Sequence, residues 1–320
     1  MGLIEVRYFA GIDIGGTNTK IGIITGEGEV LQSVSIKTLS SEGVDRTLER
    51  IWETVKELLK SLKLSEEELE GIGMGIPGPV IDKRVVGFFA NFPWDNNIDI
   101  SEKMERISGQ KTRLDNDVNV IALGEARYGA AKGYNSSVTV ALGTGIGGGI
   151  YIDGNLISGA TGAGGEIGHM KLERDGKLCG CGQKGCFETY ASATGIAREA
   201  VSRLMVNKQN MLYEMTGGDL LKVDAKMVFD AAKAGDKFSL DIVDYVSEYL
   251  AMGIGNILNI INPDVIVLAG GVAFAGDILL NSVKEKLPKY ALGVTLEELK
   301  ILLGTLGNDA GIKGASALVI

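Results

Sequence analysis

The residues best suited to bind a metal are concentrated in one short segment of this 320-residue chain. All three cysteines and the single histidine lie there, as His169 and then Cys179-Gly180-Cys181-Gly182-Gln183-Lys184-Gly185-Cys186. One nitrogen and three sulfurs are the ligand set of a closed structural zinc site, and the glycines permit turns that direct several sulfurs to one centre. Three reduced cysteines in a loop are the simpler alternative, and an iron–sulfur cluster usually needs four cysteines. We therefore predict zinc at His169, Cys179, Cys181 and Cys186, which leaves little room for histidine-based catalysis.

Two glutamates flank this segment, Glu166 just before the histidine and Glu188 just after the last cysteine. Exposed glutamates commonly have no specific role. Beside a loop that a metal holds rigid, however, two carboxylates could form a fixed fork for hydroxyl groups.

Two glycine-rich loops could bind phosphate, because successive backbone N–H groups exposed by glycine form a concavity for anions. The first reads Asp13-Ile14-Gly15-Gly16-Thr17-Asn18-Thr19-Lys20 and the second Gly143-Thr144-Gly145-Ile146-Gly147-Gly148-Gly149. Either loop alone is as readily an ordinary hairpin turn. Two of them, each after an apolar strand in matching halves of the chain, favour nucleotide binding.

The second loop also matches the dinucleotide fingerprint G-x-G-x-x-G, with Glu166 near the distance at which an acidic residue is expected. That motif requires a helix to begin at the glycines. Here the following Ile150-Tyr151-Ile152 and Asp153-Gly154 predict a hairpin strand instead. An NAD-dependent oxidoreductase is therefore only a secondary alternative.

A polar cluster, Asp115-Asn116-Asp117-Val118-Asn119, precedes a helical run over residues 120–128. Helix capping accounts for one or two of these residues. A carboxylate among them could also accept a proton from a sugar hydroxyl during phosphoryl transfer. A further segment, Asn91-Phe92-Pro93-Trp94-Asp95-Asn96, combines aromatic rings with amides and by itself predicts only a loop.

The elements that position these residues alternate between strand and helix, which predicts an α/β protein. A strand, a glycine loop, a strand, a tight turn and a strand occur twice, near residue 15 and near residue 145, which predicts two related lobes. The expected strands cover 7–14, 20–24, 30–36, 71–76, 138–142, 150–152, 156–157, 265–269 and 301–303. The expected helices cover 44–62, 120–128, 192–205, 225–234, 241–260, 278–287 and 311–320.

Composition excludes several classes of protein. The net charge of −9 argues against nucleic acid as a main partner, and 45% hydrophobic residues argue against a disordered chain. The most apolar stretch, 257–275, is interrupted by polar residues and fails as a membrane span, and the first residues do not form a signal peptide. We expect a soluble, cytoplasmic protein without a membrane or nucleic-acid partner.

Taken together, these motifs resemble the sugar kinases of the ROK family (repressors, open reading frames and sugar kinases) over essentially the whole chain. The resemblance rests on residues 13–17, 115–117 and 143–149, on Gly165-Glu166-Ile167-Gly168-His169, and on 179–188. It implies a two-lobed actin-like ATPase fold with a cleft between the lobes. The lobes would be residues 1–117 and 118–307, the second with the zinc-binding loop, and a helix over 308–320 would pack back on the first.

The resemblance also implies an activity, ATP-dependent phosphorylation of a hexose at its 6-hydroxyl with Mg²⁺, most directly of D-glucose in glycolysis. Asp117 would be the catalytic base. The implied hexose contacts are Asn91, Asn116, Asp117, Glu166, His169 and Glu188, with His169 also a zinc ligand. The implied nucleotide contacts are Asp13, Gly15, Gly16, Thr17, Asn18, Lys20, Gly143, Thr144, Gly145, Gly147, Gly270 and Gly271.

Several alternatives stay open at this stage. The hexose could be N-acetylmannosamine, fructose or allose, and the phosphoryl donor could be polyphosphate, which some relatives use. A sugar-sensing regulator is disfavoured because the chain opens on its first strand, without the helix-turn-helix segment of the family's repressors. The family resemblance favours a homodimer or a dimer of dimers over a monomer.

Overall fold

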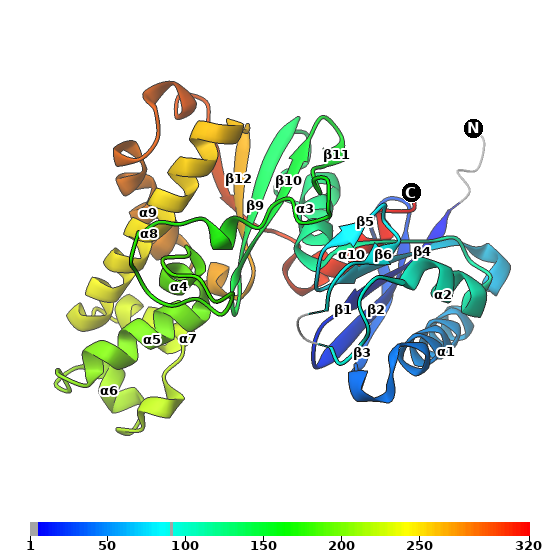
Figure 1. The fold of residues 1–320 in the computed structure, drawn as a ribbon, viewed down its shortest axis with the longest axis horizontal. Helices are drawn as coiled ribbons and strands as arrows, with labels where there is room; N and C mark the ends of the chain where they lie inside the picture. Colours follow the sequence, from blue (N-terminus) through cyan, green and yellow to red (C-terminus); the bar gives the residue numbers. More distant parts are fainter. Residues whose placement is uncertain (1–5, 90–91) are drawn as a thin grey trace. The chain divides into compact units, whose positions relative to one another are not determined.

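The computed structural model describes residues 6–89 and 92–320, which alternate between strands and helices as expected (Figure 1). The strands are β1 Tyr8–Ile14, β2 Asn18–Thr25, β3 Val30–Lys37, β4 Leu69–Ile76, β5 Val80–Ile81, β6 Val85–Val86, β7 Ile98–Asp99, β8 Thr112–Asn116, β9 Ser136–Leu142, β10 Ile146–Ile152, β11 Asn155–Leu156, β12 Val265–Ala269 and β13 Lys300–Leu303. The helices are α1 Val44–Leu62, α2 Ile100–Ser108, α3 Asp117–Tyr128, α4 Glu188–Ala191, α5 Ala193–Leu204, α6 Met211–Met215, α7 Ala225–Lys233, α8 Lys237–Ile261, α9 Asp277–Lys286 and α10 Ala310–Ser316.

Two five-stranded sheets share one topology. The first has the order β3-β2-β1-β4-β8 and the second the order β11-β10-β9-β12-β13. In the first, β1, β2 and β3 are antiparallel neighbours, whereas β4 and β8 run parallel to β1. In the second, β10 and β11 form the expected hairpin around Asp153 and Gly154, both of which have positive φ. The repeated motif in the sequence thus corresponds to a repeated sheet.

The chain divides into two compact units. Unit 1 contains residues 1–137, 149–165 and 305–320, and unit 2 contains 138–148 and 166–304. Neither unit is one continuous stretch of sequence. The lobe boundaries expected from the resemblance, at residues 117 and 307, stay a prediction.

In unit 1, one face of the first sheet is covered by α1 and α2, and the other by α10 (Figure 1). The residues of β1 alternate between these faces, because successive side chains of a strand point in opposite directions. Ala10, Ile12 and Ile14 lie in the apolar core with the buried residues of α1. Helix α1 begins and ends where its apolar spacing predicted.

The opposite face of this sheet is lined by glycine, which brings helices close to the strands. A methyl group at Gly11 would lie 2.0 Å from the carbonyl oxygen of Ile312, and one at Gly73 only 1.7 Å from that of Ala315. Helix α10 therefore packs backbone to backbone against β1 and β4. It ends at Ser316, earlier than the expected helix over 308–320, and residues 317–320 are not helical.

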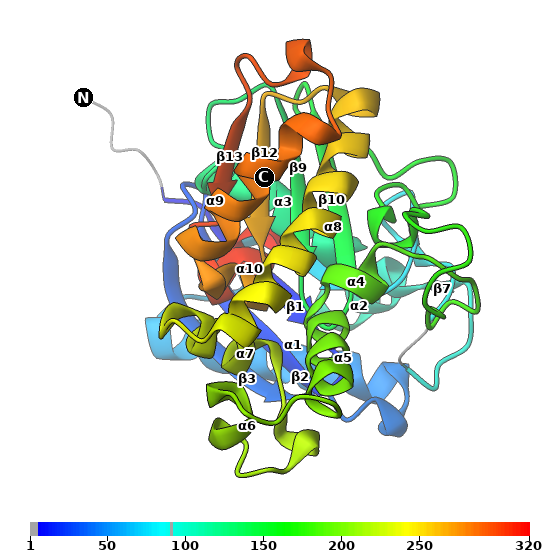
Figure 2. The ribbon, with the colours of Figure 1, turned by 90° about the vertical axis from the view of Figure 1, so that its left-hand side faces the viewer.

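In unit 2, the long helix α8 is packed against α5, α7 and α9 (Figure 2). It starts at Lys237, before the expected residue 241, because the Asp236 side chain caps it by accepting a hydrogen bond from the Ser239 amide. Among the described residues, no helix is both long enough and apolar enough to span a membrane.

Candidate active site and metal centre

The first glycine loop, Gly15–Thr17, is the turn between β1 and β2 in unit 1. The Gly15 amide donates to the carbonyl of Asn18 at 3.0 Å, and Gly16 and Thr17 are exposed. The buried residue Thr38 supports this turn through two hydrogen bonds. Its hydroxyl donates to the carbonyl of Gly15 at 2.7 Å and its amide to that of Thr17 at 3.0 Å. Two loop carbonyls are thus engaged within the protein, an arrangement suited to an anion on the amide side.

Asp13 lies at the end of β1, on the face that α10 covers. A methyl group at Gly311 would lie 2.2 Å from its Oδ2, and one at Gly75 would lie 3.7 Å from its Oδ1 and 3.6 Å from Asp117 Cα. Gly75 thus lies beside both acidic residues. Burial first, and then the charge of Asp117, raises the pKa of Asp13 to about 6, while Lys20 lowers it.

Lys20 faces Asp13 across the β1–β2 pair. Its ammonium donates to Asp309 Oδ1 at 2.6 Å and to the Asn308 carbonyl at 2.9 Å. The structure therefore gives the predicted phosphate contact Lys20 another role, which is to hold the segment before α10 to β2.

The polar cluster 115–119 spans the junction of β8 and α3. Asn116 caps α3, because its Oδ1 accepts from the Val118 amide at 2.9 Å, while its Nδ2 donates to the Gly78 carbonyl at 3.2 Å. Asp117 is the first residue of α3. Capping therefore explains Asn116 and leaves Asp117 at the positive end of the helix dipole, which favours a carboxylate there.

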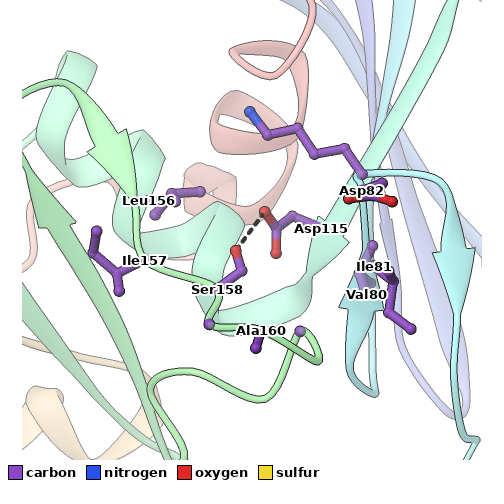
Figure 3. A pocket seen from close by; sticks show the side chains of 11 residues that line it. Val80, Ile81, Asp82, Asp115, Leu156, Ile157, Ser158 and Ala160 are labelled. Carbon is purple, nitrogen blue, oxygen red and sulfur yellow. Dashed lines mark hydrogen bonds between the residues drawn. The ribbon is translucent and has the colours of Figure 1, made fainter.

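Unlike Asp117, Asp115 lines a pocket of about 380 Å³, which is shown in Figure 3. Its Oδ1 accepts from Asn119 Nδ2 at 2.7 Å, and its Oδ2 from the Ser158 hydroxyl at 3.4 Å. Burial raises its pKa, against these hydrogen bonds and the charge of Lys83. Asp117 is not among the described residues that line this pocket, so we assign the pocket no part in catalysis.

The second glycine loop, Gly143–Gly145, is the turn between β9 and β10 in unit 2. The Gly143 amide donates to the Gly145 carbonyl at 3.0 Å, and the Gly143 carbonyl accepts from the Ala193 amide, the first of α5, at 2.8 Å. Gly270 lies against the end of β9, with φ of 84° and a Cβ position 2.7 Å from the Leu142 carbonyl oxygen. Because strand β10 follows the glycines, the helix that a dinucleotide fingerprint requires is missing from these described residues.

The predicted zinc ligands are brought together in unit 2. The ligand atoms of His169, Cys179, Cys181 and Cys186 all lie within 4.8 Å of one another. Cys181 Sγ and Cys186 Sγ are 3.7 Å apart, and Cys179 Sγ is 3.8 Å from His169 Nδ1. Ligands of tetrahedral zinc are separated by about 3.8 Å for two sulfurs and about 3.6 Å for sulfur and nitrogen, as follows from the usual Zn–S and Zn–N bond lengths. The residues therefore fit the ion.

The two flanking glutamates lie beside this centre. His169 Nε2 is 3.9 Å from Glu166 Oε2, and Nδ1 is 4.0 Å from Glu188 Oε1. Glu188 begins α4, and its Oε1 lies 2.9 Å from Cys179 Sγ. A methyl group placed at Gly145 would lie 2.6 Å from the other carboxylate oxygen of Glu188, Oε2. Glu188 thus lies beside both the cluster of predicted zinc ligands and the second glycine loop.

The structure therefore groups the predicted residues in two sets, one in each unit. Asp13, Asp117 and the first glycine loop belong to unit 1. Glu188, His169 and the second glycine loop belong to unit 2. Asn91 lies outside the described residues. Its neighbours Phe92 and Trp94 are stacked at 4.6 Å and buried in the core of unit 1, so these rings are not an exposed platform.

Sequence reasoning missed Thr38, Gly75 and Gly311, which support the first loop and Asp13 without any chemistry of their own. The strictly alternating glycines at 71, 73 and 75 were the one available signal for the close approach of helices.

Comparisons of the sequence and of the structure with known proteins agree on one family. The sequence profile described as the ROK family matches residues 9–320. A glucokinase of Halalkalibacterium halodurans is 38% identical over 318 residues, covering 98% of this chain and 95% of that protein. A glucokinase of Thermotoga maritima is 36% identical over 310 residues, covering 97% and 96%. The solved structure of a ROK family glucokinase from Streptomyces griseus in complex with glucose and AMPPNP has a TM-score of 0.81 at 30% identity and covers 97% of this chain and 98% of that one.

Proposed function

The chain belongs to the ROK family, and on that premise we propose that it transfers the γ-phosphoryl group of ATP to the 6-hydroxyl of a hexose, D-glucose first among them. Relatives named glucokinase align over nearly the full length of both chains. The fold is the actin-like ATPase fold of sugar kinases, as the resemblance implied.

The observation that carries the proposal is the placement of Asp117. It begins α3, directly after β8, and lies beside Gly75 together with Asp13. In this proposal Asp117 accepts the proton of the hexose 6-hydroxyl as the oxygen attacks phosphorus. Asp13, with Mg²⁺ bound to the nucleotide, and the amides of both glycine loops stabilise charge on the transferring group.

For the hexose itself we propose contacts from Asn91, Asn116, Glu166, His169 and Glu188. The support lies in unit 2, where two carboxylates flank one imidazole. For the nucleotide we propose the loops at Gly15–Asn18 and Gly143–Gly147, with Gly270 and Gly271 near the adenosine. Lys20 has the weakest support of this set, because Asp309 already engages its ammonium.

We further propose that His169, Cys179, Cys181 and Cys186 bind a structural Zn²⁺. The ion would hold this loop rigid and take no part in phosphoryl transfer. His169 Nδ1 faces Cys179, and Nε2 is left on the side of Glu166 to meet a hexose hydroxyl. The Lys171 ammonium, 2.7 Å from Cys186 Sγ, would offset the negative charge of the thiolates.

The proposal is tested with Asp117→Asn. This change removes the base but keeps the shape of the side chain, so kcat should fall by about a hundredfold or more while the Kd for the hexose changes less than about threefold. The measurement combines coupled ADP release with equilibrium hexose binding. Near-normal turnover of the variant would remove Asp117 from the role of base.

The matched control is Asp45→Asn, an exposed acidic residue of α1 in the same unit, which should leave kcat and KM unchanged. The substrate assignment is tested separately, by comparing glucose with N-acetylmannosamine, fructose and allose, and ATP with polyphosphate. A preference for N-acetylmannosamine over glucose would overturn the choice of D-glucose. Cytoplasmic location and a homodimer or dimer of dimers stay predictions.

A further inference from the structure

Three tyrosines of unit 2 form a cluster that the proposed reaction does not use. Tyr190 of α4 and Tyr249 of α8 are stacked with ring centroids 4.2 Å apart, and Tyr245 lies 4.9 Å from Tyr249. We call Tyr190, Tyr245 and Tyr249 the tyrosine cluster. Stacked rings from two helices form a rigid surface, because each ring has few rotatable bonds.

Lys177 joins this cluster to a partly buried carboxylate, that of Glu199. Its ammonium lies 5.1 Å from the ring centroids of both Tyr190 and Tyr245, and 2.6 Å from Glu199 Oε2. Burial by itself raises the pKa of Glu199, but the hydrogen bonds from Lys177 and Arg203 outweigh it, and the pKa is lowered. The carboxylate is therefore charged, and the lysine is held by an ion pair and two aromatic faces together.

The main chain around Lys177 is held to the same tyrosines. The Lys177 amide donates to the Tyr190 hydroxyl at 2.9 Å, and the Tyr249 hydroxyl donates to Glu173 Oε1 at 3.1 Å. At Gly176, a methyl group would lie 1.9 Å from the Tyr190 hydroxyl, so the loop approaches the ring as closely as glycine permits. The segment 169–186, which we call the metal loop, is thus attached to the cluster at two points.

These attachments lie next to the groups proposed to bind zinc and hexose. Lys177 is two residues before Cys179, and Tyr190 is two residues after Glu188. We propose that Lys177 is a positioning residue for hexose binding. Its contacts with Tyr190, Tyr245 and Glu199 hold the metal loop at a fixed position relative to the Glu188 side chain. This role rests on the proposed function, since hexose binding by Glu188 is part of it.

The test compares Lys177→Met, which keeps the aliphatic stem and removes the charge, with Lys177→Arg, which keeps the charge. In Lys177→Met the hexose KM should rise about tenfold, while kcat and the ATP KM stay within twofold. Hydrogen exchange of the metal loop should become at least fivefold faster. Lys177→Arg should restore both the KM and the exchange rates.

The matched control is Lys208→Met, because Lys208 also lies over a tyrosine, Tyr213, at 5.8 Å, but outside the metal loop. It should change neither the hexose KM nor exchange in the loop. An unchanged hexose KM in Lys177→Met, or a loss of kcat with both KM values raised together, would overturn the positioning role.

Hydrogen exchange separates this proposal from the proposed function. If the parent protein phosphorylates no hexose, the function fails, but faster exchange of the metal loop in Lys177→Met, reversed in Lys177→Arg, still supports the anchoring. Unchanged exchange contradicts the anchoring whatever the enzyme activity is.

Discussion

Asp13 is a carboxylate in an unfavourable surrounding. It lies beside Asp117 and against the backbone of α10, where burial and a like charge both oppose its ionisation. A protein selected only for stability would have an uncharged residue there. In the proposed function, Mg²⁺ bound with the nucleotide would relieve this repulsion between the two carboxylates.

The pH dependence of stability follows from the raised pKa of Asp13. Between a pKa of 3.8 in the unfolded chain and about 6 in the folded one, the folded protein binds more protons. The contribution of Asp13 to the free energy of unfolding should therefore fall as the pH rises from about 4 to about 6, by at most about 3 kcal/mol. Asp13→Asn should remove this dependence.

The measurement is urea unfolding of the parent and Asp13→Asn at pH 4 and pH 8, without nucleotide or divalent ions. The variant should be more stable at pH 8 by about 1–3 kcal/mol and nearly equal to the parent at pH 4. The same variant should lose ATP-dependent activity. An equal difference between the two proteins at both pH values would contradict the assigned cause.

At the residue scale, the types of functional side chain could be predicted from the sequence, but their partners could not. Cys179 and Cys186 were identifiable because cysteine and histidine occur nowhere else. The ion pair of Lys20 with Asp309 joins residues 289 positions apart, a contact that no local pattern indicates. The burial of Phe92 and Trp94 is likewise a property of the folded core.

Among the elements, the contact between Gly145 and Glu188 connects the second glycine loop with α4. A methyl group at Gly145 meets only the end of a flexible side chain, so Gly145→Ala should displace the Glu188 carboxylate at little cost in stability. We expect a rise in hexose KM of about tenfold, with the midpoint of urea unfolding unchanged.

Gly143→Ala is the control in the same loop, because its Cβ position is in open space. If the loop binds phosphate, both variants can raise the ATP KM, but only Gly145→Ala should raise the hexose KM. Steady-state kinetics with each substrate varied separately will distinguish them. An equal rise in hexose KM in both variants would argue against a specific displacement of Glu188.

Elements in which apolar residues recur at a regular spacing were predicted well, whereas short polar elements were missed. Helix α1 has an apolar residue every three or four positions and begins and ends as expected. Strand β8, which carries Asp115 and Asn116, was not expected, because its sequence Thr-Arg-Leu-Asp-Asn is largely polar. The segment is a strand because it pairs in parallel with β4, about 40 residues earlier in the chain, and a local sequence pattern does not show such a pairing. The capping side chain of Asn116 then fixes where α3 begins.

For the molecule as a whole, the predicted metal centre belongs to unit 2 alone. Purified protein should contain close to one zinc per chain. Removing zinc with a chelator should speed hydrogen exchange over residues 169–190, while exchange in β1 and β4 of unit 1 changes less than twofold. A protein that is free of metal yet fully active and equally protected over 169–190 would contradict a structural zinc.

The position of α10 has a consequence for synthesis of the chain. The strands β1 and β4 are made early, but the glycine-lined face they share is covered by residues 310–316. While the ribosome is still adding unit 2, α3 is available to cover this face only beside Gly75, and the positions at Gly11 and Gly73 wait for α10. The backbone of β1 and β4 at Gly11 and Gly73 therefore stays without its native neighbour until translation reaches the last described helix, so unit 1 cannot complete its packing before that helix is made.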